Sequence, residues 1–396
     1  MAGRRQKPAG GFGREAPGSA TWVEVPVRIL YLGTAENEHL RRWVEAAVAR
    51  GHEAHVATFE PPASMDGWSA VIHPLHGDRS RLIRYLGALA DVRDLARRLR
   101  PDLLHAHFLT GYGYLAPWIG VRPWALTVWG TDILRNPDRS RADAWLSIRA
   151  LRSADLVIGD SGDAVARAEM LGARPHSSVV VPWGVELDLF QRVEERRAAI
   201  LDRWGLPRDA QVLLSARSLA EPFYRVADVV DASLQIMAVR SRVHLVVAGE
   251  GRLAGDLKQA VAGHVAADRV RWVGQVDRPT LAGLMGVAEA YLSVPTHDAT
   301  SVALLEAMAA GAPVIASDLP SNREWVGDGA GRIVPAGDSA ALAHAILAVL
   351  DDPTGAQRAA DEAQARVAQH AGVERCQDRL DALIGAIVRP RAQSQG

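Results

Sequence analysis

The chain has 396 residues, of which 48% are hydrophobic and 23% are charged, and this balance excludes a disordered or fibrous protein. Its 45 lysine and arginine residues are matched by 46 acidic ones, so no overall charge favours nucleic acid or an anionic membrane as a partner. The single cysteine, Cys376, excludes an intrachain disulfide and a thiolate metal cluster, and we expect it to be a buried structural thiol.

Residues 1–22 are basic and rich in glycine and lack an apolar stretch of signal-peptide length, so we predict a disordered leader. No later run reaches the roughly 18 apolar residues that span a bilayer, which leaves peripheral contact as the expected limit of membrane association. Arginine is preferred over lysine and alanine is abundant, as in proteins from GC-rich bacterial genomes. These features predict a bacterial cytoplasmic protein.

The first ordered part of the chain, residues 23–190, alternates short apolar runs with stretches of helical periodicity. The first run, at residues 27–32, ends at Gly33 and is followed by a helical pattern from Leu40 to Val48. After residues 50–59, further strands are expected at residues 69–75, 102–108, 124–130 and 154–160, with a helix over residues 82–99. This alternation predicts a parallel sheet covered by helices.

The same alternation begins again after a turn-rich passage at residues 179–190. Strands are expected at residues 212–217, 243–251, 270–276, 290–295, 312–318 and 331–337. We therefore predict two tandem, doubly wound, Rossmann-like α/β domains, at residues 23–190 and 191–370, followed by a C-terminal helix and tail at residues 371–396. Because ligands bind beyond the carboxyl ends of the strands in such sheets, we expect the two domains to face each other across a cleft.

The most informative segment is residues 293–320, where a predicted strand is followed by a helix over residues 301–310. Asp298 and Glu306 are separated by seven residues, one before the helix and one about two turns into it. Backbone N–H groups at a helix start carry the positive end of the helix dipole and suit a phosphate, with carboxylates on either side to accept sugar and ribose hydroxyls. An ordinary N-cap aspartate followed by a helical glutamate is the alternative. The expected helix start lies at Ala299, Thr300 and Ser301.

This segment resembles the retaining glycosyltransferases of family 4, which have the two-domain GT-B fold and a signature of two glutamates seven residues apart. The strand that follows reads GAPVIAS at residues 311–317, as in the family, whereas Asp298 stands in place of the first glutamate. The resemblance covers residues 27–350. It implies a nucleotide-sugar donor, UDP-linked by family frequency, a hexose-type sugar, retained anomeric configuration, and neither a metal ion nor a cofactor. Asp298 would then orient the sugar rather than attack it.

By the same resemblance, Arg217 matches the arginine that contacts the donor diphosphate, where a guanidinium binds phosphate in a bidentate manner. The lysine that the family usually has some five residues further is missing, and Phe223 and Tyr224 occupy that region. Arg225 is the candidate for the second cation, with an exposed surface charge as the alternative.

Two further segments resemble the family's nucleotide-binding loops. Gly249 and Gly251 flank the GEG turn that follows a predicted strand, where the absence of side chains lets a backbone approach a ligand. After the next strand, backbone groups from Val273 to Gln275 would lie against the nucleotide base.

In the first domain, Gly33 occupies the turn after the first strand and is a candidate for the donor-binding site. His105 and His107 lie on one face of a later strand because side chains alternate with a period of two. Such a pair suggests a metal site, but a third ligand at a defined spacing is absent. The resemblance places His107 near the reacting sugar. A strand-end histidine that is satisfied by its neighbours is the alternative.

Four residues of the first domain are acceptor candidates: Glu36, His39, Trp129 and Asp132. Trp129 can stack on a sugar or ring face, and core packing is its alternative role. The acceptor stays open between a glycan precursor and a small secondary metabolite such as an aminocyclitol. Two rival functions are a sugar-nucleotide 2-epimerase of the same architecture and a non-catalytic nucleotide-sugar-binding subunit, the latter suggested by the missing lysine and by Asp298.

Overall fold

The computed structural model describes residues 26–62, 64–76, 81–190 and 197–388. The chain divides into two compact units: unit 1 runs to Trp183 and resumes at Glu374, and unit 2 is Gly184–Val373. The observed division differs from the predicted boundary, because the last helix, α15 (Val373–Ile387), returns to unit 1 instead of forming a separate tail. The predicted leader at residues 1–22 lies outside the described residues.

Unit 1 contains a parallel sheet with the strand order β3-β2-β1-β4-β5-β6-β7. Its strands are β1 (Arg28–Leu32), β2 (Glu53–Thr58), β3 (Val71–Pro74), β4 (Leu103–His107), β5 (Trp124–Val128), β6 (Leu156–Gly159) and β7 (Ser178–Val180). The strands predicted from the apolar runs are confirmed. β7 was missed, because three residues at the edge of a sheet are too short to show a periodicity.

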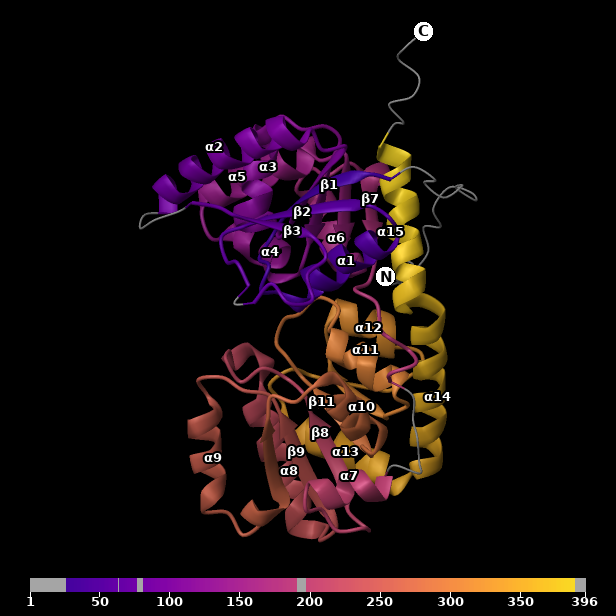
Figure 1. The fold of residues 1–396 in the computed structure, drawn as a ribbon. Coiled ribbons are helices and arrows are strands. Elements are labelled where there is room, and N and C mark those ends of the chain that lie inside the picture. The colour runs from indigo at the N-terminus through magenta and orange to yellow at the C-terminus, as the bar shows by residue number, and fades with distance from the viewer. Residues whose placement is uncertain (1–25, 63, 77–80, 191–196, 389–396) are drawn as a thin grey trace, which may run out of the picture. The chain divides into compact units, whose positions relative to one another are not determined.

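The helices of unit 1 cover both faces of this sheet. They are α1 (Glu38–Ala49), α2 (Arg81–Leu99), α3 (Tyr114–Ile119), α4 (Thr131–Leu134), α5 (Arg141–Ser153), α6 (Gly162–Met170) and α15. Figure 1 shows α2, α3 and α5 together on one side of the sheet, over a core that includes Leu30, Leu104 and Leu126. On the other side, Arg50 at the end of α1 forms an ion pair of 2.8 Å with Asp381 of α15. Cys376 of α15 is buried, as expected for a structural thiol.

Unit 2 contains a second parallel sheet with the strand order β10-β9-β8-β11-β12-β13. Its strands are β8 (Gln211–Ser215), β9 (Val243–Ala248), β10 (Val270–Gly274), β11 (Ala290–Ser293), β12 (Val314–Ser317) and β13 (Arg332–Val334), and each was predicted. Its helices are α7 (Arg197–Arg203), α8 (Val226–Val239), α9 (Ala254–Ala262), α10 (Arg278–Gly286), α11 (Val302–Ala309), α12 (Pro320–Val326), α13 (Ser339–Asp351) and α14 (Pro353–His370).

Both sheets reverse their strand order once, between β1 and β4 in unit 1 and between β8 and β11 in unit 2. In a parallel sheet the loops after neighbouring strands emerge at the same edge, and ligands bind where the order reverses. Each unit therefore has one switch point at which the loops after two adjacent strands converge.

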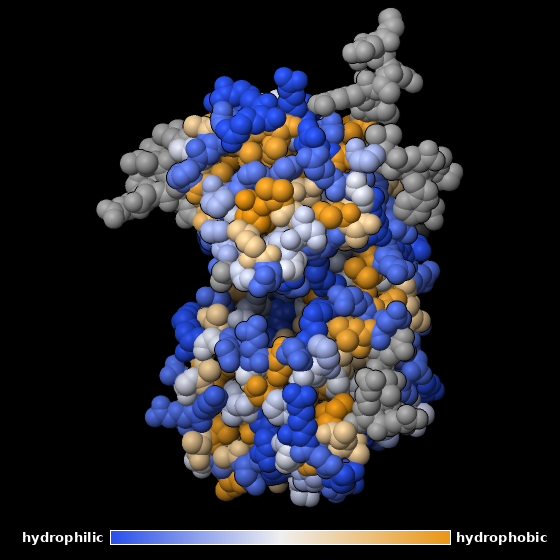
Figure 2. Space-filling view, in the orientation of Figure 1, coloured by the Kyte–Doolittle hydropathy of each residue, from blue (hydrophilic) through white to orange (hydrophobic). Residues whose placement is uncertain are grey.

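The surface is mixed in character. Figure 2 shows hydrophilic side chains over most of the displayed face of both units, interspersed with smaller hydrophobic patches. Within the described residues, every helix is too short or too polar to cross a bilayer.

Candidate active site

At the switch point of unit 2, Arg217 and Asp298 form an ion pair. Arg217 follows β8 and Asp298 follows the adjacent β11, so the parallel pairing of these strands brings the two side chains together. Arg217 Nη2 donates to Asp298 Oδ2 at 2.5 Å, and Arg217 Nη1 donates to Ser301 Oγ. Burial of the guanidinium opposes its charge, but Asp298, together with Tyr291 and Tyr224, outweighs this effect and raises the pKa of Arg217, which therefore stays charged.

The loop in which the family's lysine is missing packs against this pair. The Arg217 guanidinium lies over the ring of Tyr224, 4.4 Å from its centroid. Phe223 stacks on His297 at a centroid distance of 4.3 Å, and the Phe223 carbonyl accepts from the Thr296 amide at 2.9 Å. Phe223 thus joins the loop after β8 to the loop after β11, and the ring of Tyr224 packs against the Arg217 guanidinium.

Arg225, the candidate second cation, is held by its own helix. Its Nε and Nη2 atoms donate to the two oxygens of Asp228 at 2.7 and 2.8 Å. Its backbone has a φ of 55° at the start of α8, an uncommon conformation for a residue with a side chain. The structure therefore places this guanidinium in an ion pair with Asp228 of α8, which leaves the N–H groups of Nη1 to bind a phosphate.

Helix α11 starts at Val302, slightly later than predicted. Ser301 is its N-cap, and the Ser301 hydroxyl accepts from the Leu304 amide at 3.3 Å. Ala299 and Thr300 lie in the turn before the helix, and Thr300 Oγ1 accepts from Trp325 Nε1 at 3.4 Å. The positive end of α11 therefore lies next to Arg217, through their shared contact with Ser301.

Glu306 is buried in α11 and is paired with Arg278, which sequence reasoning missed. Arg278 Nη1 donates to Glu306 Oε1 at 2.8 Å, and Arg278 Nη2 lies 3.4 Å from Glu186 Oε1. The same guanidinium lies 5.3 Å from the ring centroid of Phe190. Glu306 is 4% exposed, so its proposed ribose contact requires that this ion pair be shared or rearranged.

The glycines of the GEG turn are required by the protein's own packing. Gly249 and Gly251 have φ values of 144° and 154°, which side chains rarely permit. A Cβ atom at Gly251 would lie 2.0 Å from the Ala220 nitrogen, and one at Gly249 would lie 2.3 Å from the Arg217 carbonyl oxygen. These glycines therefore allow a close approach of the loop that carries Arg217, and the approach of a ligand to their backbone stays a prediction.

The backbone after β10 is tied to the same turn. The Gly249 amide donates to the Gly274 carbonyl at 2.8 Å, and the Gln275 amide lies 3.4 Å from Glu250 Oε1. Val273 is half-buried and Gln275 is exposed. Val273 to Gln275 therefore lie next to the GEG turn, and their contact with the nucleotide base stays a prediction.

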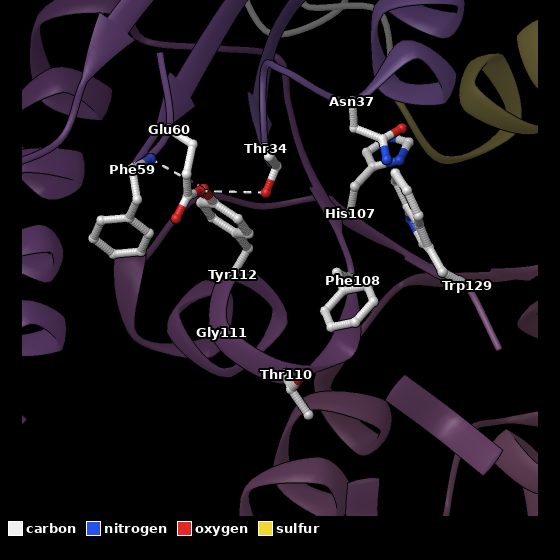
Figure 3. A pocket seen from close by; sticks show the side chains of 10 residues that line it. All are labelled: Thr34, Asn37, Phe59, Glu60, His107, Phe108, Thr110, Gly111, Tyr112 and Trp129. Atoms are coloured by element: carbon white, nitrogen blue, oxygen red, sulfur yellow. Dashed lines mark hydrogen bonds between the residues drawn. The ribbon is translucent and has the colours of Figure 1, made fainter. Parts of the chain in front are cut away.

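At the switch point of unit 1 there is a pocket of about 370 Å³. Its walls are formed by residues that follow β1, β2, β4 and β5: Thr34, Asn37, Phe59, Glu60, His107, Phe108, Thr110, Gly111, Tyr112 and Trp129. Figure 3 shows Thr34, Glu60 and Tyr112 on one side of the pocket, and His107, Phe108 and Trp129 on the other. The carboxyl ends of four strands thus converge on one cavity.

A hydrogen-bond network orders the polar side of this pocket. Glu60 Oε2 accepts from the Tyr112 hydroxyl at 2.9 Å and from Thr34 Oγ1 at 3.3 Å, and the Phe59 amide donates to the Tyr112 oxygen at 3.0 Å. Burial is the main cause that raises the pKa of Tyr112 to about 12, so the phenol keeps its proton and donates to Glu60.

The two histidines of β4 share one face, as predicted. Their ring centroids are 4.3 Å apart, and His105 Nε2 hydrogen-bonds with Thr127 Oγ1 at 2.8 Å. Burial lowers the pKa of His105 to about 3 and, with the help of His105, lowers the pKa of His107 well below its usual value. Both rings are neutral at physiological pH. Neither nitrogen of His107 has a hydrogen-bond partner within the described residues, although His107 lines the pocket.

The acceptor candidates of unit 1 have different surroundings. Trp129 lines the pocket, and His39 packs between Trp129 and Trp183 at centroid distances of 6.1 and 5.1 Å. Glu36 is exposed and does not line the pocket, although the lining residues Thr34 and Asn37 lie on either side of it in the chain. Gly33 lies directly before the pocket, where a Cβ atom would lie 2.6 Å from Leu40 Cδ2. Of the four acceptor candidates, Glu36, His39, Trp129 and Asp132, Trp129 alone is among the described residues that line the pocket.

Asp132 is fully buried beneath the pocket. Its Oδ2 accepts from the Leu109 amide at 2.7 Å and its Oδ1 accepts from the Trp129 amide at 2.9 Å. Burial raises the pKa of this carboxyl to about 6, against the opposing effect of these N–H donors. The geometry favours a positioning role for Asp132, which holds the two loops that carry the pocket's aromatic wall.

Sequence reasoning missed Glu60, Phe108 and Tyr112, all of which line the pocket. Glu60 follows the predicted strand at residues 50–59, and Phe108 follows His107. The rule that ligands bind at carboxyl ends of strands therefore contained a signal for both of them. Tyr112 lies several residues into a loop, where that signal is lost.

Two doubly wound parallel α/β units of this topology, each with its polar residues at the switch point, define the architecture of the GT-B glycosyltransferases. The family description "Glycosyl transferase 4-like" matches residues 28–161, and "Glycosyl transferases group 1" matches residues 210–352. These matches fall one in each unit and together cover more than half of the chain. The chain belongs to the family 4-type glycosyltransferases.

Individual relatives support the same assignment. A phosphatidyl-myo-inositol mannosyltransferase of Mycobacterium leprae is 34% identical over 188 residues, covering 47% of this chain and 48% of that protein. A D-inositol 3-phosphate glycosyltransferase of Geodermatophilus obscurus is 32% identical over 250 residues, covering 60% of this chain and 53% of that protein. The chain thus matches about half the length of these curated relatives.

The fold itself is matched over nearly the whole chain. The crystal structure of Anabaena HepE in complex with UDP has a TM-score of 0.79 at 19% identity and covers 91% of this chain and 100% of HepE. At 19% identity this similarity establishes the fold but does not identify the substrates.

Proposed function

We propose that the chain is a retaining glycosyltransferase that moves a hexose from a UDP-linked donor to an acceptor hydroxyl. The observation that carries this proposal is Arg217, a buried cation held between Asp298 and Ser301 at the start of α11. Buried positive charge beside a helix N-terminus is the environment that a diphosphate leaving group needs.

In the proposed reaction, the bond between the anomeric carbon and the diphosphate oxygen breaks, and its electron pair leaves with the nucleoside diphosphate. Arg217 and the positive end of α11 stabilise the negative charge that develops there. The acceptor hydroxyl attacks the anomeric carbon from the same face, and its proton passes to the departing phosphate oxygen. Asp298 orients the sugar through its hydroxyl groups and holds Arg217 in place.

On unit 1, His107 is proposed to contact the reacting sugar as a neutral imidazole. Its burial and its lowered pKa exclude a role as a cation at physiological pH, and leave it one ring N–H to donate and one ring nitrogen to accept. Such a group distinguishes sugar hydroxyls by hydrogen bonding alone.

The base and the sugar of the donor are proposed by analogy. HepE has been solved with UDP-glucose, whereas another relative, 26% identical over 273 residues, is named a GDP-mannose-dependent mannosyltransferase. UDP-glucose and GDP-mannose are therefore the two donors to compare directly, and we place the UDP-linked hexose first.

The test is to titrate the purified full chain with UDP and GDP by calorimetry and to follow hydrolysis of UDP-glucose, UDP-galactose and GDP-mannose by chromatography. We expect UDP to bind more tightly than GDP and a UDP-hexose to be hydrolysed slowly without acceptor. Retention is checked by the anomeric proton coupling of the first product. Binding without hydrolysis or transfer would support the non-catalytic subunit, and the absence of nucleotide binding would refute the proposal.

A further inference from the structure

The pocket of unit 1 contains a carboxylate but no positively charged lining residue among those that the structure describes. Its polar lining consists of Thr34, Asn37, Glu60, His107, Thr110 and Tyr112. His107 is neutral because burial lowers its pKa, so it does not supply a positive charge. The charge of the lining is therefore negative, through Glu60.

This charge decides which ligands the pocket tolerates. A phosphate ester carries one to two negative charges, and bringing it next to a carboxylate in a partly enclosed cavity costs affinity by direct repulsion. Proteins that bind phosphate place arginine, lysine or helix N-termini around it. Helix α1 begins at this pocket, but the side chain of its N-cap Asn37 already accepts from the His39 and Leu40 amides of the first turn. The described lining otherwise offers hydroxyl, amide, imidazole and carboxylate groups, which are the usual partners of sugar hydroxyls.

The shape of the lining fits a ring. Phe59 and Phe108 contribute aromatic side chains, and Trp129 stands next to His107 with ring centroids 6.1 Å apart (Figure 3). Aromatic rings pack against the C–H face of a sugar or cyclitol, while Glu60 can accept a hydroxyl proton and Asn37 Nδ2 can donate to a hydroxyl oxygen at the ring edge. The volume of about 370 Å³ is of the size that holds one small ring compound.

The backbone at Phe108 shows that the aromatic wall is held in place. Phe108 has a φ of 77°, in a region that a bulky residue adopts only when its surroundings require it. Its amide donates to the Thr127 carbonyl at 2.9 Å and its carbonyl accepts from the Gly113 amide at 3.0 Å. The loop thus positions the ring before any ligand enters.

We propose that the acceptor group bound in this pocket is an unphosphorylated polyol ring, a sugar or a cyclitol with or without an amino group, and that Glu60 is the residue that selects against phosphate. The proposal rests on the glycosyltransferase function proposed above, since it assigns the acceptor of that reaction. It separates this chain from the named activities of its relatives, whose acceptors are phosphatidylinositol and inositol 3-phosphate.

The test compares three matched probes on the full chain: myo-inositol, an aminodeoxy-inositol and myo-inositol 1-phosphate. Binding is measured by ligand-observed NMR, and acceptor competence by the release of nucleoside diphosphate above the hydrolysis background. We expect the phosphorylated probe to bind at least about tenfold more weakly than the other two, as repulsion by one nearby carboxylate predicts.

The variant Glu60→Gln keeps the shape of the side chain and removes its charge. We expect the phosphorylated probe to bind about tenfold better to E60Q than to the parent chain, the amino probe to bind several-fold worse, and myo-inositol to change by less than about threefold. Glu53→Gln is the matched control. Glu53 begins β2, the strand that precedes Glu60, lies at the end of β2 away from the pocket, and is half-exposed. E53Q should leave the ratios among the three probes unchanged.

Three outcomes would overturn the proposal: preferred binding of the phosphorylated probe, ratios that E60Q does not alter, or no binding of any probe. Calorimetric titration with UDP is carried out in parallel on each variant. If the parent chain neither binds UDP nor hydrolyses the donor, the proposed function fails. If it binds the donor but prefers the phosphorylated probe, only this inference fails.

Discussion

The two units place opposite chemistry at the same topological position. At the switch point of unit 2, a buried guanidinium is neutralised by a carboxylate, through Arg217 and Asp298. At the switch point of unit 1, aromatic rings, the neutral imidazole of His107 and one carboxylate surround a pocket. The parallel α/β framework is common to both, so the difference lies entirely in the loop residues that follow the strands.

The comparison also shows how each unit treats charge. Unit 2 keeps its buried charges by pairing them, as Arg278 does with Glu306. In unit 1, His105 and His107 are neutral, because burial disfavours their protonated forms. A site with buried, paired cations suits a charged leaving group, whereas a pocket with one carboxylate and no cation in its described lining suits hydroxyl-rich ligands.

The largest effect is expected at Arg217. Replacement of Arg217 by alanine removes the buried cation of unit 2, so we expect the transfer rate to fall by about 10² to 10³ and UDP binding to weaken. Steady-state kinetics and calorimetry measure the two effects. Arg240→Ala is the control, since Arg240 is exposed and pairs with Asp351. Unchanged nucleotide binding in the Arg217 variant would show that the cation of this site lies elsewhere.

The next effect is expected at Glu306. Replacement by alanine leaves Arg278 without its main carboxylate partner, and breaking a pair of this burial costs about 3 kcal/mol of unfolding free energy. Urea denaturation measures the loss, and a double variant with Arg278→Met should recover part of it. If Glu306→Ala weakens UDP binding while its stability is normal, the ribose contact rather than the ion pair is the main role of Glu306.

The stability of unit 1 is expected to depend on pH through His105. The pKa of His105 is about 3 in the folded state and about 6.5 in an unfolded chain, so below pH 6.5 the unfolded state binds a proton that the native state excludes. Stability therefore falls as the pH drops from about 6.5 towards 3, by about 1.4 kcal/mol per pH unit for this residue. Urea denaturation at pH 7 and pH 5, with hydrogen exchange of β4 peptides, measures the slope.

His105→Gln should flatten that slope even if it lowers stability at pH 7. His176→Gln is the matched control, because His176 is exposed in the same unit. Equal slopes for the His105 variant and the parent chain would mean that the ring takes up a proton in the folded state.

The smallest effect is expected at Asn37. Its side chain caps α1 by accepting from the amides of His39 and Leu40, and loss of such a cap costs about 1 kcal/mol. Asp338→Ala removes an equivalent cap from α13 of unit 2. Thermal unfolding should show similar losses for both variants, whereas a change in acceptor affinity is expected only for Asn37→Ala, because Asn37 also lines the pocket. Equal acceptor affinities would restrict Asn37 to its capping role.

The sequence by itself determined the strands and the two-unit plan. Buried parallel strands are near-continuous apolar runs, and each such run predicted from the sequence became a strand. The sequence also selected Asp298, Ser301 and Glu306 as site candidates, because their spacing around a strand end and a helix start is local, whereas Arg217 was selected by its resemblance to the family. β7 was missed because three residues are too few to show a periodicity. The assignment of α15 to unit 1 was missed because the local sequence of a helix does not indicate which unit it packs against.

Only the tertiary structure decided which residues meet. The pairing of Arg217 with Asp298 depends on β8 lying next to β11, and the partnership of Arg278 with Glu306 joins two helices. The pocket around Glu60 and Tyr112 combines loops after four strands. Such contacts depend on strand order and on packing between residues that are far apart in the sequence. Strand and helix propensities depend instead on neighbours in the chain. The sequence therefore predicted the secondary-structure elements, whereas the fold determined which residues form the site.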